Sequence, residues 1–137
     1  MAIPKNQGRQ EVIAASVVLK YDEITDDTGA DEAAISVPAG ARVVGGNVTI
    51  DTVFNSTTSD VLTCGDATDP NRYLATPADL TSATASYPLD GVLNKVYPVK
   101  TDITVAWTAG ATGTATQGEA VLTVMYVEDG RSAFAQD

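Results

Sequence analysis

The sequence predicts an all-β domain, an antiparallel two-sheet sandwich of the jelly-roll kind with at most one short helix. Three observations support this prediction. The regular segments are rich in Val, Ile and Thr, turn-forming residues cluster between them, and apolar and polar side chains alternate along most of them. Seven or eight strands of uneven length, joined by polar turns without intervening helices, are typical of two packed antiparallel sheets.

The first predicted strand covers residues 12–21, and both of its faces carry apolar side chains. We therefore expect it to lie centrally in a sheet or at an interface. The following segment, residues 22–32, contains six carboxylates and no basic side chain, which indicates an exposed loop. A short strand is expected over residues 33–37, closed by the turn Pro38-Ala39-Gly40.

The longest predicted strand covers residues 42–54 and contains the pair Gly45-Gly46, where we expect a bulge or a close backbone approach. Its second half alternates, and the face that carries Val48 is predicted to point into the core. Another strand is expected over residues 60–64. A hydroxyl, a proline and a carboxylate at Thr76, Pro77 and Asp79 then predict one short helix that ends near residue 83.

The last third of the chain predicts three more strands. Residues 92–99 form one that Pro98 interrupts, and Trp107 is expected to be buried in the second, on the same face as Ile103 and Val105. The third covers residues 119–128. Its predicted inward side chains are Ala120, Leu122, Val124 and Tyr126.

The length of 137 residues fits one domain. We expect a flexible N-terminal arm at residues 1–10, a single sandwich at 11–130 and a C-terminal tail at 131–137. The N-terminus lacks the apolar core of a signal peptide, and no stretch approaches a membrane span, so synthesis and folding are expected in the cytosol.

Charge and composition exclude several classes of function. The formal net charge is −10, which disfavours nucleic-acid and anionic-membrane partners. Histidine is absent and Cys64 is the only cysteine, so the common nucleophile–base pairs, imidazole metal sites and disulfides are absent too. We expect no enzyme activity and no cofactor.

Two acidic segments are candidate cation sites. The carboxylates of residues 22–32 could bind Ca²⁺ through oxygen, but their spacing does not match an EF-hand, so a solvated loop is favoured. Asp66, Asp69 and Asn71 form a second oxygen-rich group, for which ordinary turn chemistry is the favoured interpretation. Paired carboxylates that hydrolyse glycosides remain a less favoured alternative.

The N-terminal segment, residues 2–10, is polar and carries Lys5 and Arg9 with no acidic residue. A frayed terminus is the simpler interpretation. The alternative is an arm that becomes ordered on a neighbouring subunit.

Residues 37–74 carry a specific series of turn and strand residues, including Val37-Pro38-Ala39-Gly40-Ala41-Arg42, Gly45-Gly46-Asn47-Val48-Thr49-Ile50-Asp51 and Asp69-Pro70 before Arg72-Tyr73-Leu74. A weaker series covers residues 119–131. With this series the chain resembles the capsid cement (decoration) proteins of tailed bacteriophages, most closely those of Bordetella podoviruses. No catalytic motif is part of the resemblance.

The resemblance implies a dimeric jelly-roll protein, made in the host bacterial cytoplasm, that binds the outside of an icosahedral shell across junctions between major capsid protein subunits. Candidate contacts with the shell or a second copy come from the two ends of the chain and the first strand: Ile3, Lys5, Arg9, Val12, Ala14, Val18 and Phe134. The alternative hypothesis is a carbohydrate-binding module of a virion or tail. It would use loop carboxylates and the rings of Tyr73, Tyr87 or Tyr97.

Overall fold

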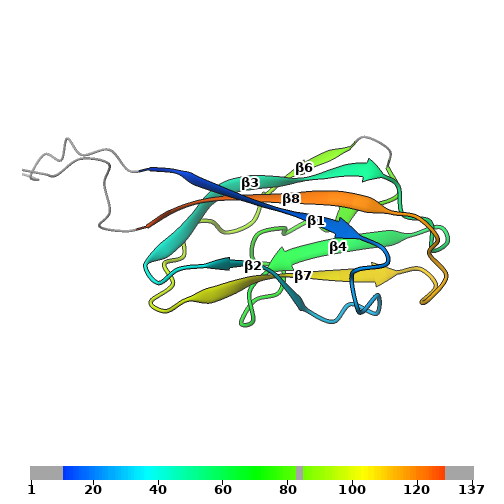
Figure 1. Cartoon of the computed structure of the whole chain (residues 1–137), viewed down its shortest axis with the longest axis horizontal. Coiled ribbons are helices and arrows are strands. Elements are labelled where there is room, and N and C mark those ends of the chain that lie inside the picture. Colours follow the sequence, from blue (N-terminus) through cyan, green and yellow to red (C-terminus); the bar gives the residue numbers. More distant parts are fainter. Residues whose placement is uncertain (1–10, 83–84, 129–137) are drawn as a thin grey trace, which may run out of the picture.

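The computed structural model describes residues 11–82 and 85–128, which form two antiparallel four-stranded sheets packed face to face (Figure 1). This part of the chain contains no helix. The strands are β1 (Ile13–Lys20), β2 (Glu32–Val37), β3 (Ala41–Thr52), β4 (Asp60–Gly65), β5 (Ala78–Asp79), β6 (Ser86–Pro88), β7 (Thr101–Ala109) and β8 (Glu119–Glu128).

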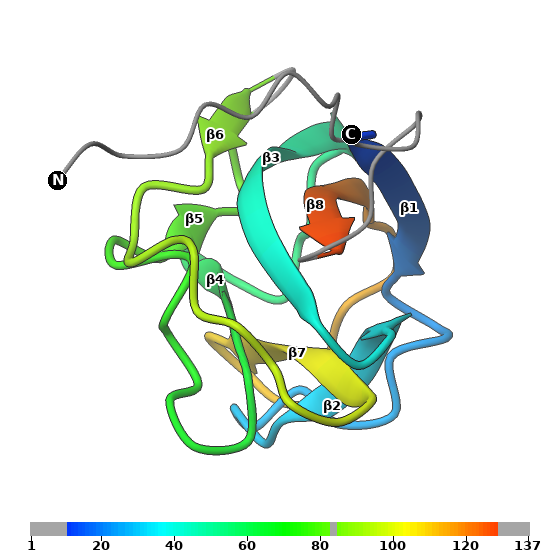
Figure 2. The ribbon, with the colours of Figure 1, turned by 90° about the vertical axis from the view of Figure 1, so that its left-hand side faces the viewer.

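The strand order is β1-β8-β3-β6 in one sheet and β2-β7-β4-β5 in the other. Strands that follow one another in the chain mostly lie in different sheets, so the connections cross between layers, as in a jelly roll. Figure 2 shows the two sheets as an upper and a lower layer, with β1 above β2 on one side. The predicted all-β jelly-roll sandwich is confirmed.

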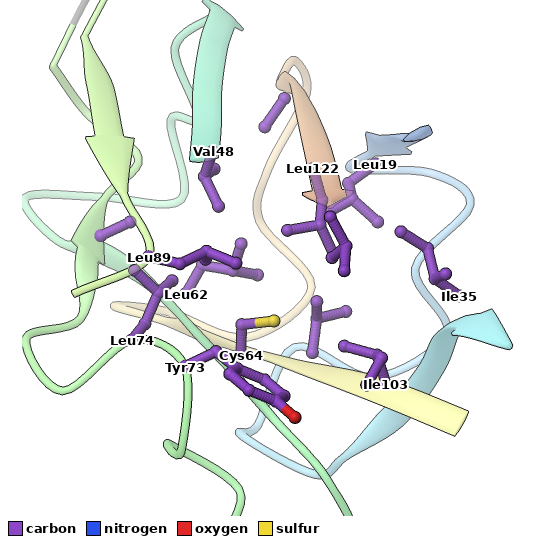
Figure 3. Packing of buried hydrophobic residues seen from close by; sticks show 14 of the residues in the cluster. Leu19, Ile35, Val48, Leu62, Cys64, Tyr73, Leu74, Leu89, Ile103 and Leu122 are labelled. Carbon is purple, nitrogen blue, oxygen red and sulfur yellow. The ribbon is translucent and has the colours of Figure 1, made fainter. Parts of the chain in front are cut away.

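The core lies between the sheets. Figure 3 shows Val48 and Leu122 from one sheet facing Leu62 and Ile103 from the other. Trp107 is buried as predicted, and its ring meets Phe54 edge to face at a centroid distance of 5.0 Å. The four predicted inward side chains of β8 are buried: Ala120, Leu122, Val124 and Tyr126.

The glycine pair in β3 has the role that its sequence predicts. The pairing of β3 with β8 shifts register between Val43 and Gly45, which is a bulge. Gly46 has φ 142°, and a Cβ atom there would lie 2.1 Å from the carbonyl oxygen of Thr123. Only glycine fits this position, because any side chain would collide with β8.

The first strand lies elsewhere than expected. β1 is an edge strand that pairs only with β8, not a central one. Leu19 is buried on its inward face, whereas Val18 is 44% exposed on the other. The apolar residues of that second face therefore lie on the surface, and the expectation of an interface stays open.

Two element predictions are wrong. Residues 78–79 form strand β5 instead of a helix, because the backbone there bonds to other elements: Leu80 N–H donates to the Asp60 carbonyl at 2.9 Å. Residues 92–99 form an irregular connection, with one isolated bridge from Val96 to Arg42. Asn94 at φ 73° breaks the extended backbone that a strand needs.

Candidate interaction surfaces

The two sides of the sandwich differ. On the open side, the edge strands β1 and β2 lie next to each other in different sheets (Figure 2). On the closed side, the short strands β5 and β6 and the connections 66–77 and 89–100 cover the sheet edges. These two connections are hydrogen-bonded to each other, because Val92 N–H donates to the Arg72 carbonyl at 2.7 Å.

A groove of about 190 Å³ runs along the open side. Its apolar lining comes from both sheets and the loop after β1: Val17, Leu19, Ile24, Ala34 and Val105. Lys20, Glu23 and Glu32 add charge to its lining. Glu32 is held in place because Thr25 donates to its carboxylate from the backbone at 3.1 Å and from the hydroxyl at 2.8 Å.

The outer face of β1 and β8 is a second exposed surface, which we call the outer apolar face. It consists of Val12, Ala14, Val18, Val121 and Met125. Ala14 pairs with Met125 and Val18 with Val121, so the apolar side chains come in cross-strand neighbours. Val12, Val18 and Met125 are 56%, 44% and 38% exposed.

The predicted contact residues divide into two groups. Ala14 and Val18 are exposed on the first strand, and the exposed Val12 directly precedes it. Ile3, Lys5, Arg9 and Phe134 lie outside the described residues. Met125 and Glu23 were not predicted as contacts. The alternation of the last strand places Met125 opposite its inward residues and could have identified it, but no local pattern links Glu23 with the groove.

The closed side contains a buried polar network around Asp66, which is 2% exposed. Its carboxylate accepts hydrogen bonds from Arg72 Nε at 2.7 Å and the Tyr97 hydroxyl at 2.6 Å. It also accepts the Thr68 hydroxyl at 2.8 Å and the backbone N–H of Asp69 at 2.9 Å. Tyr97 is in turn hydrogen-bonded to the hydroxyl of Tyr73.

Burial alone would raise the pKa of Asp66, but the hydrogen bonds from Tyr97, Arg72 and Thr68 outweigh it and hold that pKa well below the usual range. Burial, and the hydrogen bonds with Asp66 and Tyr73, raise the pKa of Tyr97. Asp66 is therefore ionised and Tyr97 protonated at neutral pH. The network is internally satisfied, which indicates that it fixes the loops rather than binding a ligand.

A second buried carboxylate, Asp60, lies beside β5 and is fully buried. It accepts hydrogen bonds from Trp107 Nε1 at 2.8 Å and from the backbone N–H of Ser56 at 3.0 Å. The hydroxyl of Ser56 also bonds to it. These contacts attach the connection after β3 to strand β7.

The acidic loop uses several of its carboxylates in local structure. Asp26 accepts the backbone N–H and hydroxyl of Thr28, and these bonds lower the pKa of Asp26. Asp27 accepts the N–H of Gly113 at 2.7 Å. Within residues 11–82 and 85–128, no three carboxylate or thiol side chains come together as a metal site would need. No helix there could cross a membrane.

The rings proposed for sugar stacking are mostly inaccessible. Tyr73 is fully buried and Tyr97 is 3% exposed, so neither can lie flat against a sugar. Tyr87 is half-buried on β6, and its hydroxyl donates to the Asp79 carbonyl at 3.1 Å. Two of the three rings that the carbohydrate-binding hypothesis requires are therefore not accessible for stacking on a sugar.

Comparison with known proteins identified no matching family model and no matching curated protein. Solved structures do share the fold. A chain in the capsid asymmetric unit of cyanophage Pam1 aligns with TM-score 0.60 and 24% identity, covering 93% of this chain and 92% of that one. A chain in the acidic stable capsid of Helicobacter pylori bacteriophage KHP30 aligns with TM-score 0.63 and 14% identity, covering 90% and 93%.

A chain in the capsid of Ralstonia phage GP4 aligns with TM-score 0.56 and 14% identity, covering 96% of this chain and 91% of that one. In each case the similarity extends over nearly the full length of both chains. The jelly roll of this protein is therefore a fold that also occurs in chains of bacteriophage capsid structures.

Proposed function

We propose that this chain is a structural protein of a bacteriophage virion, a cement (decoration) protein on the outer surface of the capsid. One observation carries the proposal: its fold matches chains in three phage capsid structures over at least 90% of its own length. The resemblance of residues 37–74 to cement proteins supports it independently. The resemblance to Bordetella podoviruses in particular remains a prediction.

The proposed mechanism is non-enzymatic. A protein that binds the assembled shell but not its separated subunits stabilises the assembly by mass action. Copies distributed over one particle multiply this effect without any chemical step. The major capsid protein is the proposed partner, bound across subunit junctions. The net charge of −10 would keep such a surface protein soluble.

The outer apolar face is the proposed contact between two copies. Its apolar pairs Ala14–Met125 and Val18–Val121 flank a central polar pair, Ser16 and Thr123, whose hydroxyls are hydrogen-bonded to each other at 3.0 Å. Those polar groups are already satisfied, so a second copy could cover them at low cost. A homodimer across this face is thus compatible with its chemistry.

The test is co-sedimentation of the purified protein with empty shells of its own phage, followed by thermal disruption of those shells. We expect saturable binding at a fixed ratio to capsid protein and a raised disruption temperature. A parallel series with EDTA tests whether a cation takes part. Failure to bind at any concentration would contradict the proposal.

A further inference from the structure

The four edge strands of the sandwich are not equally protected against pairing with another strand. β6 has three residues and ends in Pro88, and β5 has only two. β2 shifts register between Ala33 and Ile35, which makes a bulge. Short length, proline and bulges are the usual devices that prevent an edge from accepting a further strand.

β1 has none of these three devices, although it ends in the charged Lys20, whose carbonyl already accepts the N–H groups of Glu23 and Ile24 at 3.0 Å. It has eight residues, pairs with β8 in an unbroken register from Ile13 to Lys20, and contains no proline. Alternate residues of such an edge direct their N–H and C=O groups outward, where another extended chain can pair with them. Within the described residues, β1 is therefore the edge best suited to strand addition.

The groove adds side-chain recognition to this edge. It lies beside the second half of β1, where Val17 and Leu19 contribute to its lining, and Ala34 lines it from β2. Its volume of about 190 Å³ suits one large apolar side chain, since a cavity of about 150 Å³ accommodates benzene. The two carboxylates of Glu23 and Glu32 outnumber the single ammonium group of Lys20 in its lining, which favours a basic residue next to that apolar one.

A second copy of the protein does not fit this site well. The inward side chains of its own β1, such as Leu19, are packed in its own core and cannot enter a neighbour's groove. Two copies would also bring the acidic residues Glu23 and Glu32 of each toward the other. The chain's own N-terminus enters β1 at Ile13, the end away from the groove. The site suits an extended segment that has no core of its own.

We propose that the open side of the sandwich binds an extended segment of the capsid shell protein, which adds as a strand to β1, inserts one apolar side chain into the groove and places a basic residue near Glu23. This proposal rests on the proposed function. Strand addition supplies affinity through backbone hydrogen bonds and specificity through alternate side chains.

The first test is site-directed cross-linking. Cys64 is fully buried, and burial raises the pKa of its thiol to about 12, so a thiol introduced at the surface is the reactive one. A Glu23→Cys variant, labelled with a benzophenone maleimide and bound to empty shells, should cross-link to one extended segment of the shell protein. Asp51→Cys, at an exposed position two strands away from β1, is the matched control and should give little of that product.

The second test is affinity. Glu23→Lys should raise the Kd for empty shells by about five-fold at low salt, because it places a cation beside the proposed basic residue. Asp51→Lys makes the same change in net charge and should alter the Kd by less than about two-fold. Ala34→Phe fills the groove and should weaken binding more than either, with thermal melting used to confirm that it folds.

The outcomes separate the two proposals. If the wild-type protein does not bind shells, both fall. If it binds and these variants bind equally well, the cement role stands and the strand-addition proposal is overturned. Cross-linking of Glu23→Cys to another copy, or to residues 1–10 of this chain, would also overturn it.

Discussion

The closed side of the sandwich contains a buried, fully hydrogen-bonded polar network, whereas the open side exposes a strand edge and a groove. On the closed side, the Asp66 carboxylate accepts hydrogen bonds from five different donor groups, and the surrounding loops are hydrogen-bonded to each other. On the open side, a regular edge strand and a groove face the solvent. The difference separates stability from recognition: changes on the closed side should affect folding, and changes on the open side should affect binding.

The largest effect is expected in the core between the two sheets, at Trp107. Trp107→Ala removes a fully packed ring and the indole N–H that donates to Asp60, which stays buried. We expect a loss of about 3–5 kcal/mol in the free energy of unfolding, measured by urea denaturation. Thr108→Ala, at the exposed neighbouring residue, should change it by less than about 0.5 kcal/mol. Equal losses in the free energy of unfolding for the two variants would contradict the expectation that the buried side chain contributes more than the exposed one.

Asp66→Asn should cost about 2–4 kcal/mol at pH 7, because Arg72 loses its buried partner. The folded pKa of Asp66 is depressed, so its stabilisation is present above the unfolded pKa of about 3.9 and is lost as the pH falls toward the folded pKa. The difference between wild type and variant should thus be constant above about pH 5 and shrink below about pH 4. Denaturation curves from pH 3 to 7 measure it, and a difference independent of pH would contradict this account.

Tyr97→Phe should have a smaller effect on stability. It removes the hydroxyl that donates to Asp66 and bonds to Tyr73, but retains the ring. We expect a loss of about 1–2 kcal/mol, measured by thermal or urea denaturation. Tyr87→Phe is a suitable control, because the Tyr87 hydroxyl makes a single bond to a backbone carbonyl at an exposed site. If shell binding per folded molecule fell with Tyr97→Phe, the separation of the two sides would be wrong.

The smallest effect on stability is expected at the outer apolar face. Val18→Lys combined with Met125→Lys changes two exposed side chains, so the free energy of unfolding should change by less than about 1 kcal/mol. Self-association should be lost, because a second copy would then have to bury two charges. A concentration series in light scattering measures it. If the double variant still forms a dimer, the contact between two copies lies outside the outer apolar face.

The sequence was sufficient to predict those strands in which apolar and polar side chains alternate over many residues. The predicted bounds of β8 are those observed, and the core position of Trp107 is confirmed. Strands β5 and β6 were not predicted, since two or three residues carry no detectable period. The helix signal at Thr76 and Pro77 was overridden by the long-range hydrogen bond of Leu80 with Asp60.

The interaction surfaces were less predictable, because they depend on which strands are neighbours. Apolar residues on both faces of β1 suggested a central strand or an interface, and only the strand order reveals that β1 lies at an edge. The groove joins residues of β1, β2 and the loop that carries Glu23, and its lining extends to Val105 in β7. No local pattern specifies that combination of distant segments.

The place of β8 in its sheet has a consequence for synthesis. Among the described strands, β8 comes last in the chain and lies between β1 and β3, so neither of these can complete its pairing until β8 has been synthesised. Domains generally fold as units during translation, and here the sheet that contains β1 and β3 can form only once β8 is available. A chain truncated before Glu119 would lack the strand that links β1 to its sheet, so prematurely terminated copies should be cleared by proteases instead of competing with complete ones.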